Sequence, residues 1–98
     1  MIKEIVAEIK RPDKTPKPSG APVVVAEEGD TAPNIHYYVV WDRFQGVDED
    51  VRSKIVFEAV KRGRPKDYRG LITALGLTTR EAIAMGVPGY EGALAGNR

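Results

Sequence analysis

Apolar residues near the start of the chain recur at the spacing of one helical face. They stand at positions i, i+3, i+4 and i+7, and they are Ile2, Ile5, Val6 and Ile9. This spacing predicts a helix over residues 2–10. Because several of these side chains are β-branched, which favours strands, an edge strand over residues 5–10 is the alternative.

Two further apolar runs predict a β-hairpin. Residues 23–26 form a short β-branched run that ends before Gly29. Residues 35–41 are apolar at both odd and even positions, which is typical of a central strand covered on most of both faces. The intervening loop contains Pro33, and its length suits an antiparallel connection.

The segment after this central strand has clear start and stop signals for a helix over residues 48–62. Asp48 is a favourable N-cap, and acidic residues follow it in the first turn. A wide apolar arc runs through the segment and consists of Val51, Ile55, Val56, Ala59 and Val60. Gly63 is predicted to adopt the left-handed conformation after the helix, and Pro65 prevents continuation.

The last third of the chain predicts a third strand and a second capped helix. Residues 71–75 lie between two glycines and predict a strand, with a short helix as the alternative because Ala and Leu favour helices. Thr78 and Glu81 have the spacing of a capping box, so a helix is predicted up to Met85. Gly86 is expected to end this helix in the left-handed conformation.

The predicted elements follow the order α-β-β-α-β-α within one domain of 98 residues. The second and third strands are joined through a helix, so they are expected to run parallel with a right-handed crossover. The predicted fold is an α+β two-layer sandwich, with a small three-stranded mixed sheet and helices on one face. Residues 11–22, rich in Pro and Lys, are expected to form a linker loop, and residues 89–98 a frayed tail.

Composition and isolated motifs give no support for an enzyme. The chain has no cysteine and a single histidine, which excludes thiolate sites and disulfides, so no metal or cofactor is expected. His36 has no Ser, Cys or carboxylate partner at a recognisable spacing, and no nucleophile motif or phosphate-binding loop is present. No signal peptide and no run of about 20 apolar residues for a membrane span is found, so a soluble cytoplasmic protein is expected.

Charge is unevenly distributed, although the formal net charge is only +1. Residues 27–50 carry seven acidic groups and one Arg, whereas residues 51–69 carry seven basic groups and two acidic ones. The basic residues that could contact the phosphates of DNA or RNA are Arg52, Lys54, Lys61, Arg62, Arg64, Lys66 and Arg69. Charge asymmetry of this kind is also typical of a solvated surface.

Two DNA-binding motifs are partly matched. The order Arg-Gly-Arg-Pro over residues 62–65 is that of an AT-hook, in which arginines enter the narrow minor groove. Helix capping explains the same residues fully, because basic side chains, Gly and Pro are typical of a helix end. Residues 82–87 have the spacing of a helix-turn-helix turn, but the three glycines after it are unfavourable for a recognition helix.

A turn and a basic pair near the middle of the chain resemble the BolA family. In that family a strand ends in an aromatic-x-Gly turn, and an Arg-His-Arg triplet opens the following helix. Phe44 and Gly46 match the turn, and Arg52 and Lys54 match the two basic residues of the triplet. The resemblance implies a fold related to KH-type nucleic-acid-binding domains.

The resemblance extends over roughly residues 23–86, judged by the order of elements. His36 stands before the strand, as a histidine of the family does. Ser53 stands where the family has the triplet's histidine, which is tied to iron–sulfur ligation with monothiol glutaredoxins. Without that histidine and without cysteine, the cluster role is not carried over to this chain.

The remaining apolar residues favour a function in protein binding. Tyr37 and Trp41 share one strand face and Tyr38 lies on the other, so core packing is predicted, with base stacking as the alternative. Phe57 lies outside the apolar arc of its helix, which predicts contact with a protein partner or a second copy. We therefore expect a small non-enzymatic domain acting through protein–protein contact or homodimerisation, with a nucleic-acid-binding module as the alternative.

Overall fold

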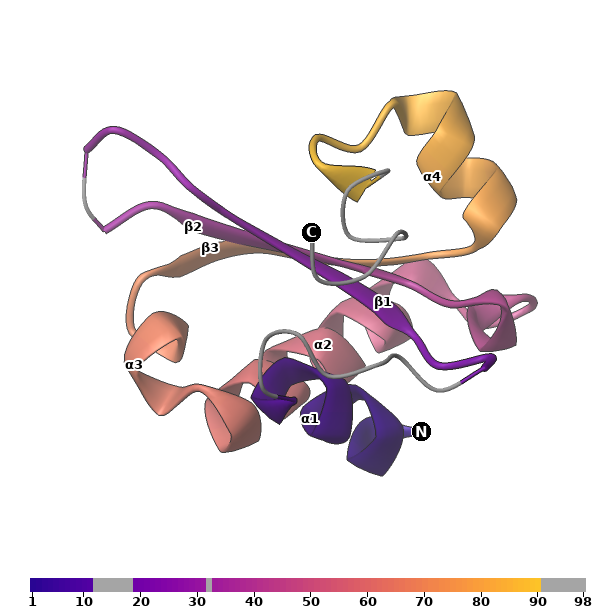
Figure 1. The fold of residues 1–98 in the computed structure, drawn as a ribbon, viewed down its shortest axis with the longest axis horizontal. Helices are drawn as coiled ribbons and strands as arrows, with labels where there is room; N and C mark the ends of the chain where they lie inside the picture. Colours follow the sequence, from indigo (N-terminus) through magenta and orange to yellow (C-terminus); the bar gives the residue numbers. More distant parts are fainter. Residues whose placement is uncertain (12–18, 32, 91–98) are drawn as a thin grey trace.

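A three-stranded sheet forms the middle of the molecule, with helices on both sides of it (Figure 1). The computed structural model describes residues 1–11, 19–31 and 33–90. In chain order, the elements are α1 (Ile2–Lys10), β1 (Val23–Glu28), β2 (Ile35–Val40), the 3-10 helix η1 (Asp42–Phe44), α2 (Glu49–Gly63), α3 (Pro65–Tyr68), β3 (Leu71–Leu77) and α4 (Thr79–Met85). The predicted α+β class and the predicted order are confirmed, with η1 and α3 as short additions.

The sheet has the order β1-β2-β3, so β2 is the central strand as predicted. β1 pairs antiparallel with β2, and β2 pairs parallel with β3. An irregularity between Ile35 and His36 shifts the register at the start of the parallel pair. Both the hairpin and the parallel crossover follow the sequence expectation, and residues 71–75 form a strand rather than a helix.

The larger core lies between the sheet and the two long helices. Tyr37 and Val39 of β2, and Trp41 directly after it, point towards α1 and α2. They pack there in one cluster with residues such as Ile5 and Val56. The indole Nε1 of Trp41 donates a hydrogen bond to the carbonyl of Gly20 at 3.0 Å. These contacts confirm the helix over residues 2–10 and the core position of Tyr37 and Trp41.

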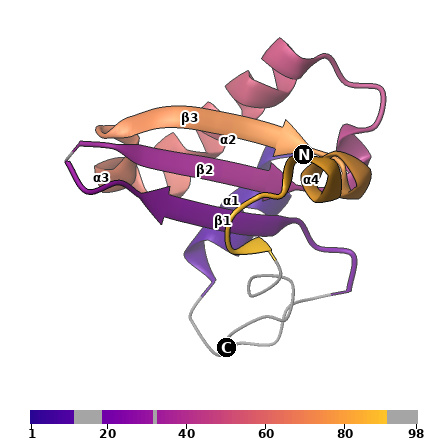
Figure 2. The same cartoon turned by 90° about the horizontal axis from the view of Figure 1, so that it is seen from above.

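The opposite face of the sheet is covered at one end by α4 and the residues after it (Figure 2). Ala82, Val87 and Tyr90 pack there against β1, the end of β2 and Leu77 of β3. This position differs from the expectation of helices on one face only. The physical reason is that β2 is apolar on both faces, so the face turned away from α2 also has to be covered.

The sequence predicted the ends of α4 better than the ends of α2. Thr78 and Glu81 form the predicted capping box, and Gly86 ends α4 with a positive φ of 64°. Gly63, in contrast, is the last helical residue of α2 rather than a left-handed residue beyond it. It is small because α1 packs closely: a Cβ on Gly63 would lie 2.8 Å from Cγ2 of Ile9. Asp48 precedes α2 but makes no capping hydrogen bond with its side chain.

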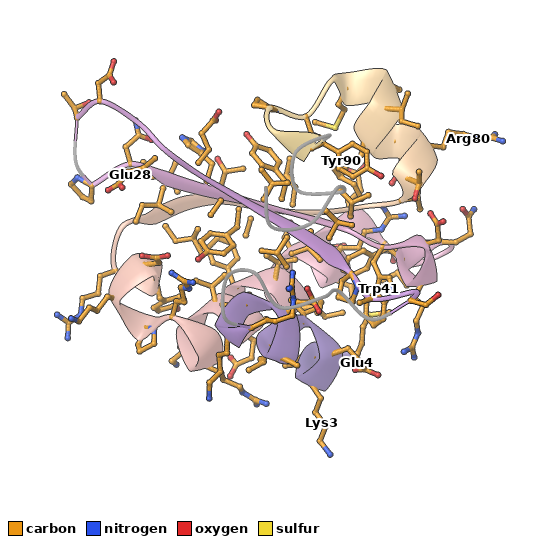
Figure 3. The ribbon with its side chains drawn as sticks, viewed as in Figure 1. Lys3, Glu4, Glu28, Trp41, Arg80 and Tyr90 are labelled. Carbon is orange, nitrogen blue, oxygen red and sulfur yellow. The ribbon has the colours of Figure 1, made fainter. Side chains whose placement is uncertain are left out.

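The two expected irregular segments lie only partly within the described residues. Residues 12–18 of the predicted linker and residues 91–98 of the predicted tail are outside them. Tyr90 is buried against the sheet, so the expectation of a tail from residue 89 is wrong at this position. Figure 3 shows Tyr90 on the α4 side of the sheet, above the strands. Among the described residues, no helix is both long and apolar enough to cross a membrane.

Candidate functional site

A groove with a volume of about 610 Å³ runs along the free edge of β3, between α2 and α4. Its floor is the end of β3, where Leu75, Gly76 and Leu77 line it. One wall comes from the first turns of α2 and the other from α4, including Ala84 and Met85. This volume lies within the range of about 300–1,000 Å³ that is typical of ligand-binding pockets. We call it the β3–α4 groove.

The free edge of β3 carries backbone groups that face away from β2. The amide of Trp41 donates to the carbonyl of Leu77 at 2.7 Å, so Leu77 directs its backbone groups towards β2. Because successive residues of a strand direct these groups to opposite sides, Ala74 and Gly76 direct theirs to the free edge. Ala74 is only 4% exposed and Gly76 is buried, so these backbone groups are covered and are not open to an added strand.

Arg52 of α2 binds one of these backbone groups, the carbonyl of Gly76. Its side chain is only 8% exposed, and its Nη1 donates to the carbonyl of Gly76 at 3.2 Å. The same Nη1 donates to Oε1 of Glu81 at 2.6 Å, and Nε donates to the carbonyl of Val47 at 2.7 Å. Arg52 thus joins the start of α2, the end of β3 and α4. These bonds correct its assignment to a phosphate-binding surface, because the side chain is buried and its Nε and Nη1 donate to groups within the fold.

Glu81 connects this arginine to the capping box of α4. Its carboxylate accepts a hydrogen bond from the backbone N–H of Thr78 at 2.8 Å, while its own N–H donates to Oγ1 of Thr78 at 3.3 Å. The backbone bond from Thr78 and then the bond from Arg52 lower the pKa of Glu81. The anionic form is therefore the one that holds α4 in place.

The outer surface of α4 is apolar over three consecutive residues. Ile83 is 68% exposed and Met85 is 55% exposed, with the exposed Ala84 between them. Ala84 and Met85 line the groove, and Ile83 continues the apolar surface beyond it. The polar Arg80 points away from the body of the molecule at the start of the same helix (Figure 3). This surface was not among the predictions from the sequence, although the unbroken apolar run Ala82-Ile83-Ala84-Met85 was a signal for it.

The predicted partner residue Phe57 lies elsewhere. It is half-buried and packs against the core beneath α1 and α2. This contact explains why an apolar residue stands outside the main arc of α2. Phe57 is therefore less suited to a partner than the more exposed Ile83 and Met85 of α4.

Most of the predicted phosphate-binding residues are exposed at the other end of α2. Lys61, Arg64, Lys66 and Arg69 come together where α2 is followed by α3. Nε of Arg64 donates to the carbonyl of Ile9 at 3.4 Å, which brings the exposed Lys10 at the end of α1 to the same region. We call this set the basic corner: Lys10, Lys61, Arg64, Lys66 and Arg69.

Three details limit what this region can bind. Arg62 pairs with Glu58 at 2.9 Å and is partly neutralised. Arg62 and Gly63 are helical, so the extended backbone of an AT-hook is not present. Lys54 is exposed but lies about 10 Å along α2 from Lys61, at a rise of about 1.5 Å per residue. Most of the recognition helix that a helix-turn-helix would require, residues 88–96, lies outside the described residues.

Outside the groove and the basic corner, Tyr37 forms a structural contact and His36 lies within the sheet. The hydroxyl of Tyr37 donates to Oδ2 of Asp67 at 2.6 Å, and burial together with this bond raises the pKa of Tyr37. His36 lies beside Glu27 and Thr73 on the sheet face that carries α4. Among the described residues, no three His, Cys, Asp or Glu side chains are grouped as metal ligands.

Comparison with known proteins adds no relative from which a role could be taken. No protein-family model, no curated protein and no solved structure matches this chain. The resemblance to the BolA family therefore stays a prediction.

Proposed function

We propose that this chain is a non-enzymatic protein-binding domain that holds its partner in the β3–α4 groove. The observation that carries the proposal is the exposed apolar run Ile83-Ala84-Met85 beside the β3–α4 groove. Three consecutive exposed apolar residues are unusual on a surface that meets only water. Apolar surface beside a groove is typical of a site for another protein.

The composition of the site favours a protein partner. Apolar side chains of β3 and α4 form the floor and one wall, while Glu49 and Asp50 form a polar rim on α2. An apolar centre with a polar rim is the usual arrangement of a protein interface. A second copy of the chain and a different protein both satisfy this proposal, and the experiment below separates them.

Site-specific photo-cross-linking in the full chain tests the proposal. A photoreactive residue at Met85, in cells that express the chain, is expected to give one dominant protein adduct. The same residue at Lys3 is the control, because Lys3 is exposed on α1, on the far side of the sheet (Figure 3). The change Ile83→Lys is expected to reduce the adduct at least several-fold without affecting folding, since Ile83 is exposed.

The mass of the adduct identifies the kind of partner. An adduct at twice the mass of the chain indicates homodimerisation, and any other mass indicates a different protein. Equal amounts of adduct from Met85 and Lys3 would contradict the proposal. An amount of adduct that does not change in Ile83→Lys would contradict it as well.

A nucleic-acid-binding function is the second candidate, and the basic corner favours it. The bond from Arg64 to the carbonyl of Ile9 places Lys10 of α1 beside the cations of α2 and α3. The cations of the basic corner form no ion pair with a carboxylate of residues 1–11, 19–31 or 33–90. Clustered cations of this kind suit contacts to phosphates, which weaken as salt is added. The BolA-like resemblance implies the same class of ligand.

An NMR titration with duplex and single-stranded DNA at low salt tests this second candidate. Amide shifts are expected to gather at Lys10 and residues 61–69, and the double change Lys66→Glu with Arg69→Glu is expected to weaken binding more than tenfold. Lys3→Glu is the matched control, because it changes the net charge of an exposed helix away from the corner. Shifts spread evenly over the surface would exclude a specific site.

A further inference from the structure

We infer that the occupant of the β3–α4 groove is α4 of a second copy of the chain, so that two copies each place α4 in the groove of the other. The inference rests on the proposed function, because it names the partner that the same groove accepts. Three features carry it: the covered floor of the groove, the exposed face of α4 and the charges on the two sides of the contact.

The floor of the groove favours a helix over an extended segment. Ala74 and Gly76 are buried, and the carbonyl of Gly76 already accepts a hydrogen bond from Arg52. An extended segment would therefore find no backbone partners there, whereas a helix satisfies its own backbone groups. Ser53 and Ala84 are small residues in the two walls, so larger side chains of a docked helix have room between them.

α4 presents the side chains that such a groove accepts. Arg80, Ile83 and Ala84 have the spacing i, i+3 and i+4, which places them on one face of the helix, and all three are exposed. Because α4 is itself a wall of the groove, a twofold axis beside it brings each α4 to the groove of the other copy. One such contact covers Ile83 and Met85 of both copies, which are otherwise exposed to water.

The charges on the two sides of this contact are complementary. Glu49 and Asp50 are exposed on the wall formed by α2, and neither forms an ion pair with any residue that the structure describes. Arg80 is likewise exposed and unpaired within the same part of the chain, and it points away from the body of the molecule (Figure 3). Arg52 also lines the groove, but Glu81 neutralises it at 2.6 Å. The groove therefore attracts a further cation, and the exposed face of α4 carries one.

The molecular mass of the full chain in solution tests the inference. Light scattering from about 1 μM to 1 mM protein, the range of weak association, is expected to show the mass rising from 10.8 kDa towards twice that value. Arg80→Glu is expected to weaken the dimer at least about tenfold, because like charges then meet at the rim of the groove. This change keeps α4 intact, since an acidic residue in the first turn interacts favourably with the helix dipole. Lys3→Glu is the matched control, which makes the same change of charge on α1 and should leave the mass unchanged.

A pair of charge-reversed variants gives a sharper test. The variant Glu49→Lys with Asp50→Lys is also expected to be monomeric, because its groove repels Arg80. An equimolar mixture of this variant with Arg80→Glu is expected to dimerise, since both contacts of the mixed dimer then join opposite charges. Circular dichroism checks that the reversed variant is folded. If it is not, Glu49→Gln with Asp50→Asn takes its place and is expected to weaken the dimer about three- to tenfold.

Three results would overturn the inference: a mass that stays at 10.8 kDa at every concentration, a dimer that Arg80→Glu leaves unchanged, or a mixture of folded reversed variants that stays monomeric. If the photoreactive residue at Met85 then gives an adduct with a different protein, the proposed function survives without this inference. Absence of any adduct at Met85 overturns the proposed function itself.

Discussion

Replacing Arg52 by Met tests how far one buried side chain holds the groove together. Met keeps the length and apolar character of the arginine stem but removes three hydrogen bonds, to Val47, Gly76 and Glu81. We expect the free energy of unfolding to fall by about 2–4 kcal/mol. The loss comes chiefly from the two backbone carbonyls, because the partly exposed carboxylate of Glu81 can be hydrated instead.

Urea denaturation at neutral pH, followed by circular dichroism, measures this loss. A decrease of about 2–4 kcal/mol corresponds to a fall in Tm of roughly 10–25 °C for a domain of this size. The free energy of unfolding of Arg52→Lys is expected to lie between those of the unchanged chain and Arg52→Met. The reason is that one ammonium group keeps the charge but reaches fewer acceptors. Lys3→Met is the matched control on an exposed helix position and should change stability by less than about 0.5 kcal/mol.

The same variant also changes a measurable pKa. Arg52 contributes to the lowered pKa of Glu81 after the backbone bond from Thr78, so this pKa should rise in Arg52→Met without reaching its ordinary value. A carboxylate whose pKa is lowered on folding stabilises the fold at pH values above its unfolded-state pKa. This stabilisation is lost as the pH falls through the folded-state pKa. Equal midpoints for Arg52→Met and Lys3→Met, with an unchanged Glu81 titration, would refute the role assigned to Arg52.

Changes at three further positions test the structure around the sheet. Gly76→Ala is expected to cost about 1–3 kcal/mol in urea denaturation, because its Cβ would lie 2.9 Å from the buried ring of Phe44. Gly86→Ala, where space is open but φ is 64°, should cost about 1 kcal/mol, and Gly86→Asn less, which separates backbone strain from crowding. Tyr37→Phe should cost about 1–2 kcal/mol by loss of the bond to Asp67. Because the pKa of Tyr37 is raised on folding, its contribution is full below the ordinary value of about 10 and declines at higher pH, a decline that should be smaller in Tyr37→Phe. An equal decline in both proteins would contradict this assignment.

Local signals in the sequence predicted most elements, because the physics that forms them is local. The spacing of apolar residues identified α1, and the apolar residues on both faces of β2 identified it as the central strand. The capping box of α4 involves residues only three positions apart, so it could be predicted from Thr78 and Glu81 alone. The role of Gly63 was predicted wrongly because it depends on a distant contact. Gly63 has to be small because Ile9, which is far away in the sequence, packs against it.

The candidate site was less predictable, because charge and exposure depend on neighbours far along the chain. Arg52 looked like a free cation in the sequence, but the packing of β3 and α4 around it buries it. Phe57 looked unpartnered, but the core beneath α1 and α2 half-buries it. The apolar run on α4 could not be identified as exposed until the side of the sheet on which α4 lies was known.

The sequence by itself determined the order of elements, the central position of β2 and the capping of α4, since each depends on residue spacing and nearby hydrogen bonds. Only the tertiary structure decided that α4 lies opposite α1 and α2 and leaves a groove along the edge of β3. The physical reason is that burial on both faces of β2 requires a cover on each side. Which segment provides each cover depends on how the chain leaves β3, and residue spacing does not specify that direction.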